Sequence, residues 1–115
     1  MELKDLDTFY DKLPEPNKGC FLAIRTLLLA YNKEIEELKK YGLPFFYYKK
    51  KPFCYLWKDK KTQIPYIGIA KGFLIEHPSL VKGDRTRIKI FTVHPNHDID
   101  KETLYEILDL VKIHY

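Results

Sequence analysis

The chain has 115 residues, of which 45% are hydrophobic, 31% are charged and 15% are aromatic. This length fits one domain that buries its own core, so we expect a single domain over residues 1–115. The net charge of +4 is mildly basic. It argues against a dedicated nucleic-acid domain, for which a larger or more clustered excess is typical.

The sequence also indicates where the protein resides. No run of about 18 apolar residues is present, so we expect no membrane span. The acidic start MELKDLDTFYDKL lacks the apolar segment of a signal peptide. Cys20 and Cys54 lie far apart without a CxxC spacing, which favours free, buried thiols in a cytosolic protein. A Cys20–Cys54 disulfide is the alternative.

Two helices are predicted in the first third of the chain, over residues 3–12 and 18–31, because apolar residues recur there at helical spacing. Asn17 is the predicted N-cap of the second helix, and Asn32 is its predicted C-cap. The second helix carries an apolar stripe broad enough to pack against a sheet. The stripe comprises Cys20, Ile24, Leu27, Leu28 and Tyr31, widened by Phe21 and Ala23.

Residues 33–41 leave two alternatives open, a helical turn or the start of an extended segment. Gly42 permits a backbone conformation with positive φ. Pro44 biases Leu43 towards extended geometry. Any helix in this segment must therefore end before Gly42.

The next stretch is rich in aromatic residues and lysines, and it predicts a hairpin with strands over residues 45–48 and 53–58. The connecting Lys49–Lys51 contains neither Gly nor Asn, so we expect a loose turn. Alternation along the second strand places Phe53, Tyr55 and Trp57 on one face and Cys54 and Leu56 on the other.

Two further strands are predicted over residues 64–71 and 85–93, with one helical turn at residues 77–80 between them. Asp100 is the predicted N-cap of a final helix. Consecutive strands between helices indicate an α+β fold: an antiparallel sheet of four or five strands with N-terminal and C-terminal helices packed on one face. The buried stripe of the final helix is predicted to be Leu104, Ile107, Leu108 and Val111.

The segment from Glu37 to Phe45, ELKKYGLPF, resembles the signature of the YdhG-like family. That signature is an acidic residue, a short spacer ending in an aromatic residue, and then Gly-x-Pro. Leu13-Pro14 before the long helix, IGIAKG at residues 67–72 and RIKI at residues 87–90 agree with it, so the resemblance covers nearly the whole chain.

The YdhG-like family is a small bacterial domain of unknown function. Its α+β fold is likened to that of frataxin, and one branch is described as an iron chaperone. The resemblance therefore implies a frataxin-like fold and iron as a candidate ligand. In frataxins the iron site is an acidic ridge on the first helix, and the matching carboxylates here are Asp5, Asp7 and Asp11, with Glu2 and Glu15 beside them.

The second face of the sheet is the main candidate site, because both faces of the 53–58 strand are apolar. We expect cations near its aromatic residues, and an apolar floor with cations suits an anionic or aromatic small ligand. A homodimer interface and a core edged by extended lysine side chains are the alternatives. The candidate residues on this face are Tyr55, Trp57, Lys71, Arg87 and Lys89.

Glu37, Gly42 and Pro44 form a second candidate, a carboxylate held by a rigid turn at a ligand pocket. The alternative is that Gly42 and Pro44 shape a corner while Glu37 pairs with a lysine or with backbone N–H groups.

Two further segments can be interpreted either as binding sites or as solvent-exposed loops without a binding role. The segment His94–Asp98 contains two histidines and a carboxylate, which suits a metal site or a solvated loop. Lysines flank the aromatic hairpin at residues 49–51, 58, 60 and 61. They suit single-stranded nucleic acid, or a solvated tip that guards a sheet edge.

The sequence contains no Gly-rich phosphate loop, no nucleophile elbow and no paired Cys/His arrangement, so we expect no enzyme. The leading hypothesis is a non-catalytic binding domain for a small molecule or a partner protein, without a cofactor. It would use the aromatic face and the Glu37–Pro44 corner. Iron handling is the second hypothesis, and single-stranded nucleic-acid binding is the third and weakest.

Overall fold

The computed structural model describes residues 2–115, with side chains described from residue 6 onward. The five strands form one antiparallel sheet in sequence order, which confirms the predicted α+β fold. Among the described residues, no helix is long and apolar enough to cross a membrane. The elements are α1 (Glu2–Asp11), α2 (Asn17–Tyr31), β1 (Ile35–Lys40), β2 (Leu43–Tyr48), β3 (Lys51–Lys58), β4 (Pro65–Ile69), the 3-10 helix η1 (Gly72–Leu74), β5 (Lys89–Thr92) and α3 (Lys101–Lys112).

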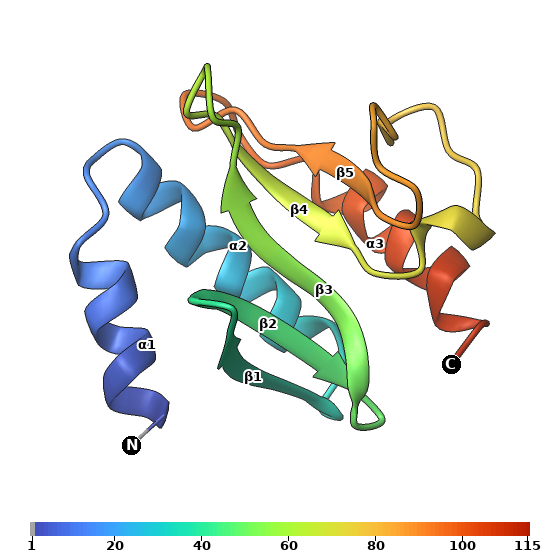
Figure 1. Ribbon diagram of the computed structural model, residues 1–115, viewed down its shortest axis with the longest axis horizontal. Coiled ribbons are helices and arrows are strands. Elements are labelled where there is room, and N and C mark those ends of the chain that lie inside the picture. The colour runs from blue at the N-terminus through green and yellow to red at the C-terminus, as the bar shows by residue number, and fades with distance from the viewer. Residues whose placement is uncertain (1) are drawn as a thin grey trace.

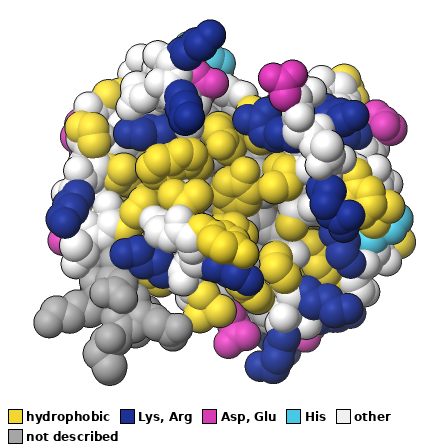
Figure 2. Space-filling view, viewed as in Figure 1, with side chains coloured by type: hydrophobic (Ala, Val, Ile, Leu, Met, Phe, Trp, Pro, Cys, Tyr) yellow, Lys and Arg dark blue, Asp and Glu magenta, His cyan; other side chains and the backbone are white. Residues whose placement is uncertain are grey.

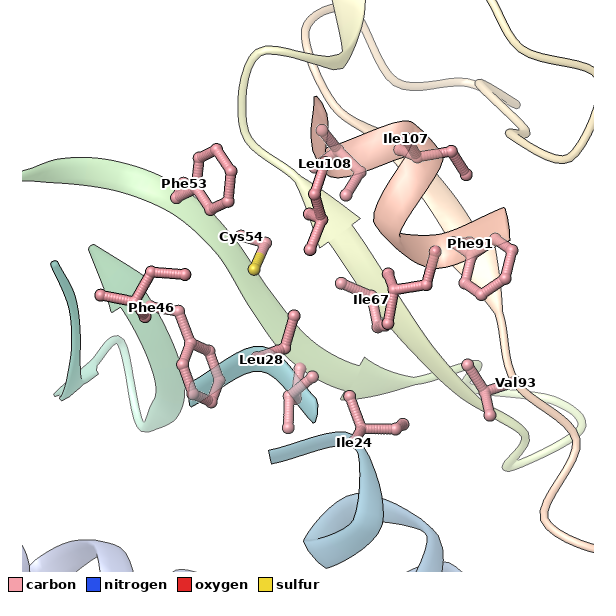
Figure 3. Close-up of a cluster of buried hydrophobic side chains, with 14 of the residues drawn as sticks. Ile24, Leu28, Phe46, Phe53, Cys54, Ile67, Phe91, Val93, Ile107 and Leu108 are labelled. Atoms are coloured by element: carbon pink, nitrogen blue, oxygen red, sulfur yellow. The ribbon is translucent and has the colours of Figure 1, made fainter. Parts of the chain in front are cut away.

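Helices α2 and α3 pack behind one face of the sheet, and α1 lies beside the end formed by β1 and β2 (Figure 1). We call the helix side the covered face. Side chains from both helices meet those of the strands in one apolar cluster (Figure 3). The predicted stripe of the final helix is confirmed, since all four of its residues are buried. The strands contribute Phe46, Cys54, Leu56, Ile67, Ile69 and Phe91 to this cluster.

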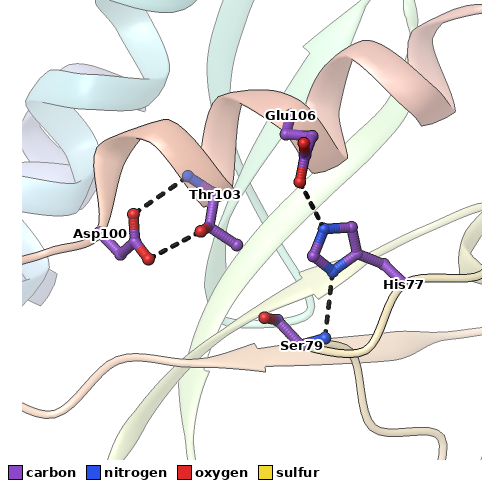
Figure 4. A network of polar contacts seen from close by, with 5 residues as sticks. All are labelled: His77, Ser79, Asp100, Thr103 and Glu106. Carbon is purple, nitrogen blue, oxygen red and sulfur yellow. Dashed lines mark hydrogen bonds and ion pairs between the residues drawn. The ribbon is translucent and has the colours of Figure 1, made fainter.

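Helix boundaries follow the predicted caps in two cases and differ in one. The Asp100 carboxylate accepts hydrogen bonds from the Thr103 backbone N–H at 3.1 Å and from its hydroxyl at 2.7 Å (Figure 4). Asn32 is the C-cap of α2, as predicted. The prediction for Asn17 was wrong, because Pro16 occupies the N-cap position. The buried Asn17 amide instead donates to the Gln63 carbonyl at 2.7 Å.

Residues 33–41 contribute strand β1 rather than a helical turn. Lys40 pairs with Leu43, so the β1–β2 turn has two central residues, Tyr41 at φ 56° and Gly42 at φ 76°. Positive φ at both positions is the geometry of a type I′ hairpin turn, whose twist matches that of the flanking strands.

The second hairpin turn is tight, so the expectation of a loose turn was wrong. Tyr48 pairs with Lys51, which leaves Lys49 and Lys50 as the central residues, with φ of 53° and 64°. Lysine has no side-chain feature that favours this conformation, which costs a non-glycine residue about 1–2 kcal/mol. The paired strands on both sides impose the turn on residues that do not prefer it.

A β-bulge changes the face on which Phe53 lies. Phe46 pairs with Cys54 and Tyr47 pairs with Pro52, which leaves Phe53 as the extra residue. The Phe53 ring is fully buried beside Tyr31 and Tyr115. The predicted alternation that placed Phe53 with Tyr55 and Trp57 was therefore wrong, because simple alternation assumes an unbroken ladder.

The connection between β4 and β5 is held by buried polar contacts. Lys89 is 8% exposed, and its ammonium donates to the Ile75 carbonyl at 2.6 Å and lies 3.2 Å from the Glu76 carboxylate. It pairs with Ile69 and belongs to the covered face, not to the aromatic face where we expected it. At residues 77–80, where one helical turn is expected, the Leu80 backbone N–H donates to the His77 carbonyl at 3.0 Å and closes a single turn, and the 3-10 helix η1 lies earlier in the connection.

His77 joins this connection to α3. The Ser79 backbone N–H donates to Nδ1 of His77 at 3.0 Å, so Nδ1 carries a lone pair and the ring proton lies on Nε2. Nε2 is 2.7 Å from the Glu106 carboxylate and donates to it (Figure 4). The histidine therefore has a structural role between the loop and the helix.

Candidate functional site

The face of the sheet away from α2 and α3 is the candidate site, and we call it the open face. Strand register places one row straight across all five strands, from Leu38 on β1 through Phe45 and Tyr55 to Gly68 and Ile90. The open face is defined by Glu36, Leu38, Lys40, Leu43, Phe45, Tyr47, Pro52, Tyr55, Trp57, Tyr66, Gly68, Ile90 and Thr92.

An unbroken line of aromatic rings runs over the open face, and we call Tyr41, Phe45, Tyr55 and Tyr66 the aromatic row. Successive ring centroids are 5.8, 5.1 and 6.2 Å apart. The two central rings, Phe45 and Tyr55, are stacked with an interplanar angle of 17°. Tyr41 is 81% exposed, the central rings are half-buried and Tyr66 is buried. Cross-strand aromatic pairs of this kind stabilise a sheet and hold each other's rotamers.

Gly68 lets the Tyr55 ring lie flat across the neighbouring strand. A Cβ atom at residue 68 would come within 2.1 Å of Cε1 of Tyr55, closer than any real contact. Only glycine therefore permits this position of the ring, which brings Tyr55 to the edge of Tyr66. No pattern in the sequence indicates this role, because the glycine and the tyrosine lie on different strands.

Trp57 lies at the margin of the open face rather than in the aromatic row. Its ring centroid is 6.3 Å from that of Phe9 on α1, so the helix covers part of the indole. The Lys58 ammonium lies 5.5 Å from the centre of the Trp57 ring. Trp57 therefore links the first helix to the edge of the candidate site.

Cations border the aromatic row at both ends. The Lys40 ammonium lies 5.5 Å from the centre of the Tyr41 ring and 5.6 Å from that of Tyr47. At the other end the Arg85 guanidinium lies 5.6 Å from the centre of the Tyr66 ring. These distances fit cation–π contacts. A hydrogen bond with Tyr47 raises the pKa of Lys40.

The open face has few negative charges to balance these cations. Among its described residues, Glu36 is the single carboxylate, and it lies 4.0 Å from the Lys50 ammonium. Figure 2 shows apolar side chains gathered in the middle of this face, with Lys and Arg side chains around them. The face is therefore apolar and aromatic in the middle and positive at its border.

Burial raises the pKa of Tyr55 to about 12, and the neighbouring Tyr66 contributes to the increase. The phenol is therefore neutral at physiological pH. Its hydroxyl can donate and accept hydrogen bonds.

Glu37 lies on the covered face, opposite the candidate site. Its carboxylate accepts hydrogen bonds from Nε of Arg25 and from the Tyr10 hydroxyl, each at 2.6 Å. The Glu37 side chain is 5% exposed, and that of Arg25 is 30% exposed. The partner is an arginine of α2 rather than a lysine or the backbone, and the contact joins both N-terminal helices to β1.

The other residues of the predicted corner have structural positions. Gly42 forms the two-residue hairpin turn, and Pro44 is buried opposite Lys39 on the covered side. The structure brings Tyr55 and Trp57 to the open face and places Glu37, Gly42 and Pro44 elsewhere. It does not gather the five residues into one site.

Lys71 and Arg87 also lie outside the open face. The Lys71 ammonium donates to the His114 carbonyl at 2.8 Å and lies 4.2 Å from the centre of the Tyr115 ring, beyond α3. The Arg87 guanidinium lies 4.2 Å from the centre of the Phe73 ring in η1. The cations beside the aromatic row are instead Lys40 and Arg85. Sequence reasoning missed both, because only the turn geometry and the loop position bring them there.

The carboxylates proposed for iron are only partly described. Asp7 and Asp11 are exposed on α1, and Asp11 lies 3.7 Å from the Lys18 ammonium. The side chain of Asp5 lies outside the described residues. Within the part of the chain that the structure describes, no group of three or more His, Cys, Asp or Glu side chains is arranged to hold a metal ion.

Two other predicted features can be located. The rings of His94 and His97 have centroids 5.7 Å apart and line a groove of about 430 Å³ with the α1–α2 loop and the β3–β4 turn. Cys20 and Cys54 are free and buried, as predicted. Burial raises the pKa of the Cys20 thiol to about 11 and raises that of Cys54 further, so both thiols are protonated near neutral pH.

Comparison with known proteins gave no family model, curated protein or solved structure that matches this chain significantly. The resemblance to the YdhG-like family therefore stays a prediction, and so does the iron handling that it implies. The site has to be interpreted from its own residues.

Proposed function

We propose that this chain is a non-catalytic binding domain whose open face holds a planar ligand that carries negative charge. The observation that supports this proposal is the aromatic row with a cation at each end. Lys40 borders Tyr41, and Arg85 borders Tyr66. Stacking on the half-buried rings would hold the planar part of the ligand, and the cations would hold its charge.

The rings are already in place before a ligand arrives. Phe45 and Tyr55 stack on each other, and Gly68 leaves room for the Tyr55 ring across β4. A side chain that is ordered beforehand loses less conformational entropy on binding, and this favours affinity. A contiguous apolar patch with a polar border is also typical of an interaction surface rather than of ordinary solvent-exposed surface.

The proposal can be tested by NMR with naphthyl phosphate as the probe, because it combines a fused aromatic ring with an anionic group. We expect saturable shift changes in backbone amides of β2, β3 and β4, centred on Phe45 and Tyr55. Cyclohexyl phosphate is the matched control, since it has the same charge without an aromatic face. It should produce weaker changes.

Changes confined to α3 or to the His94–His97 groove would place binding elsewhere and contradict the proposal, as would no change at all. Sedimentation at increasing protein concentration tests the homodimer alternative. A dimer that dissociates when naphthyl phosphate binds would show that the open face associates with a second copy of the chain.

A further inference from the structure

We infer that the ligand of the open face is single-stranded nucleic acid, with two or three bases stacked on the accessible rings of the aromatic row, Tyr41, Phe45 and Tyr55. This inference rests on the proposed function and names the class of its ligand. It departs from the order of the sequence-based hypotheses because the sequence alone could not show that Lys40 and Arg85 border one continuous line of rings.

The shape of the row suits an extended polymer. Small-molecule sites are concave and enclose most of their ligand. The hollow of about 720 Å³ beside α3 and the groove of about 430 Å³ near His94 both lie away from the open face. The aromatic row instead crosses β2, β3 and β4 in a line, with rings spaced 5–6 Å apart. Open faces of antiparallel sheets stack two or three unpaired bases on such rings in known recognition modes.

The lysines at the border favour nucleic acid over a partner protein as the ligand. Protein interfaces are depleted in lysine, whereas phosphate backbones are bound by lysine and arginine alike. The border of the open face carries Lys40, Lys58 and Arg85, each about 5.5 Å from the centre of an aromatic ring. A base stacked on a ring would therefore have its phosphate beside a cation.

The same arrangement predicts selectivity for single strands. In a duplex the base faces are stacked on each other and are closed to aromatic side chains, whereas an unpaired strand exposes them. The rings have no fixed set of hydrogen-bonding groups for one base, so we expect tolerance of sequence. Hydroxyl groups of Tyr47 and Tyr55 can add hydrogen bonds to phosphate or sugar.

Fluorescence anisotropy with labelled twelve-nucleotide oligothymidine and oligouridine tests this inference. We expect saturable binding at 50 mM salt and clearly weaker binding to a duplex of the same length. With three cations engaged, the slope of log K against log salt should be about −2. Raising salt from 50 to 200 mM should then weaken binding roughly 20-fold.

Two pairs of variants separate stacking from general charge. Tyr41→Ala removes an exposed ring of the row, and Phe73→Ala removes an exposed ring outside it. Arg85→Gln and Arg87→Gln remove cations two residues apart, of which only Arg85 borders the row. We expect Tyr41→Ala to weaken binding by about 5-fold or more. Arg85→Gln should reduce the magnitude of the salt slope by about 0.7. Phe73→Ala and Arg87→Gln should bind as the unaltered chain does.

A Tyr55→Leu variant tests the centre of the row while keeping apolar volume, and circular dichroism confirms that each variant is folded. The inference is overturned by absent or salt-independent binding, by equal affinity for the duplex, or by unchanged affinity in both Tyr41→Ala and Tyr55→Leu. If oligonucleotides fail while naphthyl phosphate still shifts β2 and β3, the proposed function stands and the nucleic-acid inference does not. If both probes fail, both are wrong.

Discussion

The covered and open faces of the sheet use the same strands for different purposes. On the covered face, Phe46 and Leu56 are fully buried, and the carboxylate of Glu37 is neutralised within the protein by Arg25. On the open face, the rings of Phe45 and Tyr55 remain partly exposed. Its cations lie against rings instead of carboxylates, so their charge remains available to a ligand. From this difference we predict that the covered face sets stability, and we propose that the open face binds a ligand.

The largest expected difference comes from neighbouring residues on β2. Phe46 points to the covered face and is fully buried, whereas Tyr47 is half-buried on the open face. Phe46→Ala should lower the free energy of unfolding by about 3–5 kcal/mol, because it leaves a cavity in the core. Tyr47→Ala should lower it by less than about 1 kcal/mol. Urea unfolding measures the free energy of unfolding of both variants. Similar losses would mean that the side chains of the open face stabilise the fold as much as those of the core do.

Glu37 and Glu36 form the next pair, again adjacent and on opposite faces. Glu37→Gln removes the charge that Arg25 and Tyr10 surround, and we expect a loss of about 2–3 kcal/mol. This is below the range for fully buried pairs because the Arg25 side chain is 30% exposed. Glu36→Gln breaks an exposed pair with Lys50 and should change stability by less than about 0.5 kcal/mol. A small loss for Glu37→Gln would show that water replaces the lost contacts with Arg25.

Much of this architecture could be predicted from the sequence because it depends on local patterns. Helical spacing identified the three helices, and the Asp100 cap follows from its position before an apolar stripe. Alternation placed Tyr55 and Trp57 on the open face correctly. The same rule failed at Phe53, because a bulge depends on how two strands pair, and Pro52 beside it is compatible with a strand start as well as with a bulge.

The composition of the candidate site was harder to predict because its contacts are long-range. The sequence predicts Lys71 and Arg87 as the cations of the open face, but their backbone positions bring them to the rings of Tyr115 and Phe73. Arg85, two residues earlier than Arg87, reaches Tyr66 instead. Which of the two arginines reaches the open face depends on the path of the chain between β4 and β5. That path is fixed by buried contacts such as that of Lys89 with Ile75.

Alkaline pH should weaken the covered face through its tyrosines. Burial and the hydrogen bond to Glu37 raise the pKa of Tyr10 well above its usual value near 10. Above pH 10 the unfolded chain loses this proton and the folded chain keeps it, so stability is complete below pH 10 and falls as pH rises. Each such tyrosine should contribute about 1.4 kcal/mol per pH unit. Urea unfolding between pH 10 and 11.5 should show a shallower decline for Tyr10→Phe; an unchanged slope would argue against this cause.

The smallest expected effect concerns the turn between β2 and β3, at the end of the sheet, where Lys49 lies beside the Tyr48 ring and Lys50 beside Glu36. Lys49 and Lys50 both have positive φ, a conformation that asparagine and glycine adopt more readily than lysine. The double substitution Lys49→Asn with Lys50→Gly should therefore raise the free energy of unfolding by about 1 kcal/mol, as measured by urea unfolding. Gly42→Ala is the reverse control, because it puts a Cβ atom at φ 76° and should cost about 1 kcal/mol.

These turn variants also separate stability from binding. The Lys49→Asn, Lys50→Gly double variant removes two exposed lysines that lie outside the border formed by Lys40, Lys58 and Arg85. If the open face binds through its rings and that border, the variant should be more stable and should bind with nearly unchanged affinity. A large loss of affinity would instead show that Lys49 and Lys50 at the hairpin tip bind the ligand. The aromatic row would then stabilise the sheet without taking part in binding.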